Sequence, residues 1–134
     1  MDSQVELHLR QLIFDRLADI VAENGIITRS ELEQLQVGDQ QWRIIDRNRG
    51  IRNPRELLAT LSVISYPKGP YADTHVGDSL YAYDYRAGST DGDNRKMRRA
   101  FELGLPIILL RTIRPGIFVP ILPVYVVADD TANR

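Results

Sequence analysis

The chain has 134 residues, of which 43% are hydrophobic and 26% are charged, and its formal net charge is −1. This length fits one domain, and this composition is that of an ordinary soluble globular protein. The absence of cysteine excludes disulfides and thiolate metal sites. No apolar run approaches the roughly 20 residues that span a bilayer, and the first residues lack the features of a secretory signal. We therefore expect a cytoplasmic protein.

The chain begins with a segment that predicts an amphipathic helix. Apolar residues recur at three- and four-residue steps from Val5 to Val21, which predicts a helix over about residues 3–23 with one apolar stripe. Asn24-Gly25 follows and supplies a C-terminal stop.

A second, short helix is predicted over residues 31–36. Thr28 or Ser30 can cap it, and Glu31 or Glu33 is well placed to complete a capping box. The pair of helices looks like the first half of a helix-turn-helix. Its second helix carries acids where a DNA reader needs Arg or Lys, so we interpret it as a structural or docking element.

The distribution of charge and the pattern of apolar residues divide the chain into three parts. Residues 1–40, the helical segment, carry three Arg against eight Asp and Glu, whereas residues 41–114 carry thirteen Arg and Lys against eight acids. The distribution of charge, and not its total, sets the local field. We predict a β-rich domain over residues 41–128 and a tail or linker over residues 129–134.

Short apolar runs broken by Gly and Pro after residue 40 indicate strands in a curved sheet. The predicted fold class is α+β, with a curved, partly closed antiparallel β-barrel preceded by the two-helix segment. One helix is expected in this half, from Asn94 to Leu103, with Asn94 as its N-cap and Gly104 as its stop. The predicted strands are Trp42–Ile45, Ala59–Ser65, Ser79–Tyr85, Ile107–Arg111 and Val124–Val127, with a further extended piece at Ile117–Val119 after a Pro-Gly turn.

Four tyrosines, several carboxylates and a run of cations lie within about thirty residues after Pro70. Aromatic rings beside amide and carboxylate groups can stack on a planar base and read its edge. Cations outside such a pocket can hold a phosphate backbone. The combination indicates nucleic-acid recognition and does not indicate catalysis.

An ordered set of short motifs extends this interpretation: Gly50-Ile51-x-x-Pro54, Leu61-Ser62, Pro70-Tyr71-x-Asp73, Tyr83-x-Tyr85-Arg86, Asp93-Asn94, Pro106 and Pro123-Val124-Tyr125-Val126. Over about residues 25–130 the chain resembles the SRA-type modified-base reader found in the N-terminal half of many bacterial HNH endonucleases. The resemblance implies a PUA-like, bent, partly closed β-barrel flanked by helices. It also implies a pocket that receives a methylated or hydroxymethylated cytosine flipped out of the duplex.

The resemblance assigns the base pocket to Tyr71, Asp73, Tyr83 and Tyr85. A flipped base must regain its stacking on aromatic faces, and Tyr71 with either Tyr83 or Tyr85 matches the stacking positions. Asp73 matches the carboxylate that accepts from the exocyclic amine of cytosine, which an ionised carboxylate can do without donating. The alternatives are core tyrosines and a turn-capping Asp73. Which tyrosine stacks and which modification fits are left open.

Six cations are predicted to contact the DNA backbone: Arg86, Arg95, Lys96, Arg99, Arg49 and Arg52. Helical spacing puts Arg95 and Arg99 on one face. The competing interpretations are a solvated helix face and, near Arg49, an ordinary β-turn with exposed charges.

No catalytic site is predicted. Two distant histidines and no cysteine do not make an HNH metal site, so any nuclease domain lies on another part or another polypeptide. We expect no cofactor or metal and no membrane contact. The expected partners are duplex DNA carrying a modified cytosine, a nuclease domain or subunit within a modification-dependent restriction system, and a second copy in a homodimer. One alternative is a protein-interaction or small-ligand-binding module on the same fold. A Mg²⁺-dependent nuclease using Asp73, Asp91 and Asp93 is another.

Overall fold

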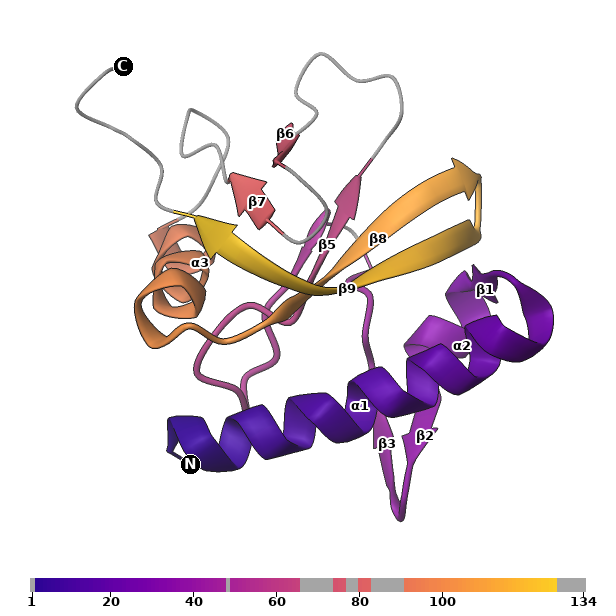
Figure 1. Cartoon of the computed structure of the whole chain (residues 1–134), viewed down its shortest axis with the longest axis horizontal. Coiled ribbons are helices and arrows are strands. Elements are labelled where there is room, and N and C mark those ends of the chain that lie inside the picture. The colour runs from indigo at the N-terminus through magenta and orange to yellow at the C-terminus, as the bar shows by residue number, and fades with distance from the viewer. Residues whose placement is uncertain (1, 48, 66–73, 77–79, 83–90, 128–134) are drawn as a thin grey trace.

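The computed structural model describes residues 2–47, 49–65, 74–76, 80–82 and 91–127. Within these ranges the fold is α+β, as predicted (Figure 1). No helix in them combines the length and the apolar character needed to cross a membrane. The elements in chain order are α1 (Ser3–Asn24), β1 (Ile27–Thr28), α2 (Arg29–Glu33), β2 (Leu35–Val37), β3 (Gln40–Trp42), β4 (Ile51–Arg52), β5 (Ser62–Ser65), β6 (Thr74–Val76), β7 (Leu80–Ala82), α3 (Asp91–Leu103), β8 (Ile107–Arg114) and β9 (Ile117–Val127).

Helix α1 confirms the predicted N-terminal helix and its stop. The Asp2 carboxylate accepts a hydrogen bond of 2.9 Å from the Val5 N–H and caps the first turn. Gly25 ends the helix with φ of 79°, a left-handed conformation that favours glycine. Its N–H donates to the Val21 carbonyl at 2.7 Å.

The buried face of α1 differs from the predicted apolar stripe. Val5 is 54% exposed and Leu12 is 45% exposed, so both lie outside the core. Glu6 and Arg10 are instead fully buried. The buried positions of the helix are Glu6, Arg10, Ile13, Phe14, Leu17 and Ile20, which follow the same three- and four-residue steps along a rotated face.

Helix α2 begins with the predicted capping box. The Thr28 hydroxyl accepts from the Glu31 N–H at 3.2 Å, and the Glu31 carboxylate accepts from the Thr28 N–H at 3.0 Å. The predicted end at residue 36 is wrong, because β2 pairs with β3 in an antiparallel hairpin from residue 35 onward. The predicted domain boundary after residue 40 falls within this hairpin.

The main sheet has the strand order β4-β5-β8-β9-β7-β6, and β1 also pairs with β9. The predicted antiparallel sheet is wrong in two pairings, since β5 with β8 and β7 with β9 run parallel. Parallel neighbours need a long crossover, and α3 and two strands lie between β5 and β8 in the chain. Among the described residues β4 and β6 form the two ends of the strand order, so no closed barrel is seen there.

Two predicted strand positions are confirmed in a longer form. The pieces predicted at 107–111 and 124–127 lie within β8 and β9, and β9 also includes the piece predicted at 117–119. The strand predicted at 42–45 is wrong beyond Trp42. Ile44 and Ile45 are buried without joining a strand, and the Ile44 N–H donates to the Leu32 carbonyl of α2 at 2.7 Å.

The main sheet is covered by helices on opposite faces, and strand alternation shows how. Along β8, Ile108 and Leu110 belong to a core cluster with Leu17 and other α1 residues. The intervening Ile107 and Leu109 belong to a second cluster with Met97 and Ala100 of α3. Successive strand residues point to opposite faces, so α1 packs on one face and α3 on the other. The N-terminal helices thus share a core with the sheet.

Helix α3 confirms the predicted helix but begins earlier. It starts at Asp91, three residues before Asn94, so the prediction of Asn94 as the N-cap is wrong. Gly104 ends the helix as predicted, with φ of 64°. The next N–H, from Leu105, donates to the Ala100 carbonyl at 3.1 Å and satisfies the last turn.

Candidate nucleic-acid interface

The second half of α3 separates a buried apolar side from an exposed basic side. Met97 and Ala100 are buried against β9 and its neighbours. Arg95, Arg98 and Arg99 are exposed. The helical repeat explains this division, since residues three and four apart share a face. The predicted phosphate-contacting Arg95 and Arg99 are therefore accessible to a large anionic partner.

The side chain of Lys96 is half-buried, whereas the neighbouring arginines of α3 are exposed. Its Nζ donates to the Pro54 carbonyl at 2.6 Å and to the Leu57 carbonyl at 2.8 Å. Burial lowers the pKa of Lys96, and the charges of Glu6 and Glu56 oppose that shift. Two of its three donors thus bind the chain itself, and the Lys96 backbone carbonyl also accepts from the Thr60 N–H at 3.2 Å.

These contacts join two basic segments that lie about forty residues apart in the sequence. The first, which we call the basic loop, is the segment of residues 43–55; it contains the short strand β4, and Arg47, Arg49 and Arg55 are exposed in it. The second is the basic side of α3. Because Lys96 binds the Pro54 carbonyl, this end of the loop lies beside α3. We call the exposed arginines of the two segments the basic surface: Arg47, Arg49, Arg55, Arg95, Arg98 and Arg99.

Arg52 and Asp46 give the basic loop a defined shape. Arg52 Nε donates to the Arg43 carbonyl at 3.1 Å, and its Nη1 lies 3.7 Å from the Asp46 carboxylate. The Asp46 carboxylate also accepts from the Arg49 N–H at 2.9 Å. Of the two predicted phosphate contacts in this loop, Arg49 is exposed, whereas Arg52 is half-buried and bonded to the loop.

Arg29 connects the other end of the basic loop to the hairpin of β8 and β9. Arg29 Nη1 donates to the Asp46 carbonyl at 3.3 Å, while the Arg29 N–H donates to the Gly116 carbonyl at 2.9 Å. The Arg29 guanidinium also lies over the Phe118 ring, 5.8 Å from its centroid. The loop therefore runs from Arg29, at the tip of this hairpin, to α3.

The predicted base pocket lies outside the described residues. Tyr71, Asp73, Tyr83 and Tyr85 belong to segments that the structure does not describe, as does the predicted phosphate contact Arg86. Their assignment stays a prediction. The described strand β7 ends at residue 82, just before Tyr83, and pairs with β9, on which α3 also packs (Figure 1).

A buried ionic network that the sequence analysis did not identify ties α1 to the sheet. Arg10 Nη2 lies 2.7 Å from the Glu6 carboxylate, and both side chains are fully buried. The Arg10 guanidinium also donates to the Ala59, Thr60 and Pro106 carbonyls at 2.7–2.8 Å. Burial lowers the pKa of Arg10, against the opposing effect of Glu6.

Glu6 completes this network from the acceptor side. Its carboxylate accepts from the Leu58 N–H at 2.6 Å and from the Ala59 N–H at 3.3 Å. The signal for the pair was in the sequence: Glu6 and Arg10 are four residues apart and continue the spacing of Ile13, Leu17 and Ile20. A search restricted to apolar residues passes over it.

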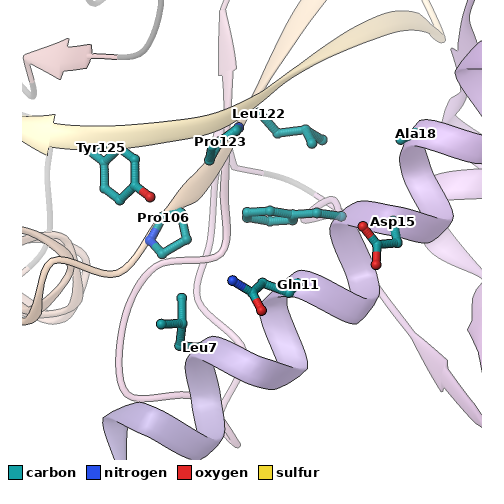
Figure 2. Close-up of a pocket in the computed structure, with 9 residues that line it drawn as sticks. Leu7, Gln11, Asp15, Ala18, Pro106, Leu122, Pro123 and Tyr125 are labelled. Atoms are coloured by element: carbon teal, nitrogen blue, oxygen red, sulfur yellow. The ribbon is translucent and has the colours of Figure 1, made fainter.

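A cavity of about 360 Å³ lies between α1 and the residues around the start of β8 and the end of β9. Leu7, Gln11 and Asp15 line it from α1, and Pro106 and Tyr125 line it from the opposite side (Figure 2). The wall is mainly apolar, with an amide, a carboxylate and a phenol as its polar groups. Such a lining suits a small ligand or one side chain of a partner.

In the described ranges no group of three or more His, Asp or Glu side chains is placed to hold a metal ion. The side chains of Asp91 and Asp93 are not described, and Asp73 lies outside the described residues. No protein-family model, no curated protein and no solved structure matches the chain.

Proposed function

We propose that this chain is a DNA-binding specificity module that recognises a modified cytosine by base flipping. In this proposal the sheet and α3 form part of an SRA-like, partly closed barrel. The basic surface contacts phosphates, and Tyr71, Asp73 and Tyr83 or Tyr85 receive the flipped base. DNA cleavage belongs to a nuclease domain or subunit outside this chain, within a modification-dependent restriction system.

The observation that supports DNA binding best is the contact of Lys96 with Pro54 and Leu57. It brings together two segments, distant in sequence, that each carry exposed arginines. Neutralising several phosphates at once releases condensed counterions, which supplies most of the affinity of a DNA-binding protein. Guanidinium groups suit this role because they bind phosphate oxygens in a bidentate manner.

The position of β7 supports a base pocket beside this surface. The strand continues in sequence into Tyr83 and pairs with β9, whose residues Val124 and Val126 pack against α3. In this proposal a duplex that lies on α3 is close to β7, and the tyrosine-rich segment follows β7 in the sequence. The identity of the flipped base rests on the sequence: a carboxylate at Asp73 favours the amine of cytosine over the carbonyl of thymine.

Titrations of matched duplexes across a range of salt concentrations test DNA binding directly. The duplexes carry cytosine, methylcytosine or hydroxymethylcytosine at one position. We expect a steep loss of affinity with salt and a preference for one modified duplex. The double substitution Arg95→Ala/Arg99→Ala should weaken all duplexes about equally, because phosphate contacts position without specifying. Its salt slope should fall by roughly one unit per lost contact.

Arg16→Ala is the matched control for this experiment. Arg16 is exposed on α1 and belongs to the acidic N-terminal segment, so its loss should leave the affinity and the salt slope unchanged. An effect of Arg16→Ala about half as large as that of the double α3 variant would assign the binding to net charge alone, since it removes one cation instead of two. No binding to any duplex at low salt would reject the proposal.

Substitutions at the predicted pocket separate base reading from duplex binding. Tyr71→Ala should weaken binding of the preferred modified duplex by about 1–3 kcal/mol, the contribution of one stacked base. Asp73→Asn should reduce the preference for modified cytosine while non-specific binding holds or rises, because the amide removes a charge and adds a donor. If Asp73→Asn lowered only the melting temperature, the carboxylate would be a turn cap.

The cavity between α1 and β9 favours a second candidate, a small-ligand or protein-interaction module. Gln11, Asp15 and Tyr125 supply a few polar groups beside its apolar residues, as in many ligand sites. Leu7→Glu places a charge on the wall of this cavity, and Leu7 is already partly exposed. Under the second candidate this variant abolishes ligand or partner binding, and the chain binds no duplex. Under the DNA proposal it leaves duplex binding unchanged.

A further inference from the structure

The hairpin of β8 and β9 carries a β-bulge near its tip. Thr112 pairs with Phe118, whereas Arg114 pairs with Ile117, so the register shifts by one residue. Ile113 is the extra residue on β8 and has no Cα partner on β9. Bulges turn a side chain away from the regular ladder, and Gly116 closes the tip with φ of 78°.

Ile113 presents an apolar side chain to solvent between two cations. It is 53% exposed, in contrast to the four buried residues at the start of the same strand. Arg111 and Arg114 on either side of it are also exposed. The bulge therefore displays one branched aliphatic group flanked by two guanidinium groups at the end of a hairpin.

This arrangement has the chemistry of a DNA wedge. Proteins that enter the minor groove insert an apolar side chain between two base pairs and unstack them. The unstacking costs free energy, and additional contacts to the deformed duplex offset that cost. Cations beside the wedge neutralise the phosphates on each side of the groove.

From this geometry we infer that Ile113 inserts into duplex DNA and unstacks a base step, with Arg111 and Arg114 on the flanking phosphates. The inference rests on the proposed DNA-binding function and adds a second contact to it. The hairpin and α3 lie at opposite ends of the sheet in Figure 1, and the basic loop connects them through Arg29 and Lys96.

The size of β8 sets the expected footprint. Its 8 residues extend over about 26 Å at the usual rise per strand residue. That length corresponds to about eight base pairs at 3.4 Å per step. If the protein contacts a duplex through both α3 and the hairpin, it should therefore protect at least about eight base pairs of that duplex.

A change in the linking number of closed circular DNA tests the wedge without knowledge of its sequence. An unmodified plasmid is relaxed by a topoisomerase in the presence of saturating protein, and the protein is then removed. Wild-type protein should leave a shifted distribution of topoisomers, because unstacking unwinds the duplex. Ile113→Ala should bind with the same salt slope, since no cation is lost, and should give the distribution of the plasmid alone.

Val5→Ala is the matched control. Val5 is 54% exposed, almost the same as Ile113, but lies on α1, so this variant should shift the topoisomers as the wild type does. Circular dichroism melting of both variants checks folding, and the truncation of an exposed side chain should leave the melting curve close to that of the wild type.

Four outcomes would overturn the inference, and they are distinguishable. Wild-type protein that binds the plasmid without shifting its topoisomers, or an Ile113→Ala variant that shifts them equally, rejects the wedge and leaves the proposed function intact. No binding to DNA rejects both. Co-sedimentation with anionic phospholipid vesicles that depends on Ile113, with no topoisomer shift, would assign the exposed tip to a membrane surface.

Discussion

Arg10 on α1 and the arginines on α3 show two different environments for the same side chain. Arg10 is fully buried, and its guanidinium contacts one carboxylate and three backbone carbonyls. Arg95 and Arg99 are exposed to solvent. The first environment leaves no donor available to a ligand, while the second leaves the guanidinium groups accessible to phosphate.

The difference teaches that the acceptors around a cation indicate its role better than its presence in a basic segment does. Lys96 illustrates the point within α3. It belongs to the same run as Arg95 and Arg99, but two of its donors bind Pro54 and Leu57. In the proposed DNA interface, Lys96 positions the end of the basic loop instead of contacting phosphate.

The largest expected effect is at Arg10. Arg10→Met removes every donor of the buried guanidinium and leaves Glu6 as an unpaired buried charge. Removing one partner of a buried ion pair costs about 3–5 kcal/mol. Urea unfolding should show this loss in the free energy of unfolding. A loss below about 1 kcal/mol would mean that the network does not hold α1 on the sheet.

The double substitution Glu6→Leu/Arg10→Met tests what the network does beyond pairing two charges. An ion pair replaced by apolar residues is often neutral or stabilising. Here five backbone groups of residues 58–60 and 106, just before β5 and β8, would also lose their partners. Each group left unsatisfied costs about 1–3 kcal/mol. We expect the double variant to remain at least about 2 kcal/mol less stable than wild type. If urea unfolding showed the double variant to be as stable as the wild type, the network would contribute no more than the pairing of its two charges.

Lys96→Met should have an intermediate effect on stability. It removes two hydrogen bonds from a half-buried site, where water can reach the freed carbonyls of Pro54 and Leu57. A charged donor of this kind contributes about 1.5–3 kcal/mol when buried, so we expect about 1 kcal/mol here by thermal unfolding. An unchanged melting temperature would show that the loop and α3 are held together by other contacts.

Arg95→Ala and Arg99→Ala should have the smallest effect on stability. Both side chains are exposed, and exposed substitutions usually change the free energy of unfolding by less than about 0.5 kcal/mol. The same variants are expected to lose duplex affinity. Urea unfolding should therefore show the larger loss for the Arg10 variant, and DNA titration should show a loss for the α3 variants. A loss of more than about 1 kcal/mol in the free energy of unfolding would show that these arginines stabilise the fold.

Local signals in the sequence predicted much of the fold. Gly25 as a stop, the Thr28–Glu31 capping box and the two long C-terminal strands each depend on neighbouring residues alone. Strand order does not, because the parallel pairing of β5 with β8 brings together segments more than forty residues apart. The pattern of each strand is the same for either direction of its neighbour, so the mixed sheet was not predictable.

The candidate site was predicted only in part, because some of its contacts join residues that are distant in the sequence. Helical spacing identified Arg95 and Arg99, and both are exposed. The acceptors of Lys96 come from a loop about forty residues away, which no local pattern indicates. Asn94 failed as an N-cap because three preceding residues continue the helix. Tyr71, Asp73, Tyr83 and Tyr85 lie outside the described residues and stay predictions.

Strand β9 has a consequence for how the chain folds as it is synthesised. It pairs with β8, with β7 and, through Phe118 and Ile117, with β1. The sheet therefore cannot assemble until residues 117–127 have left the ribosome, although α1 is complete about ninety residues earlier. Contacts of such long sequence separation slow folding. The apolar side of α1 stays without its partner during that interval, when exposed hydrophobic surface favours aggregation, so we expect this nascent chain to depend on chaperones.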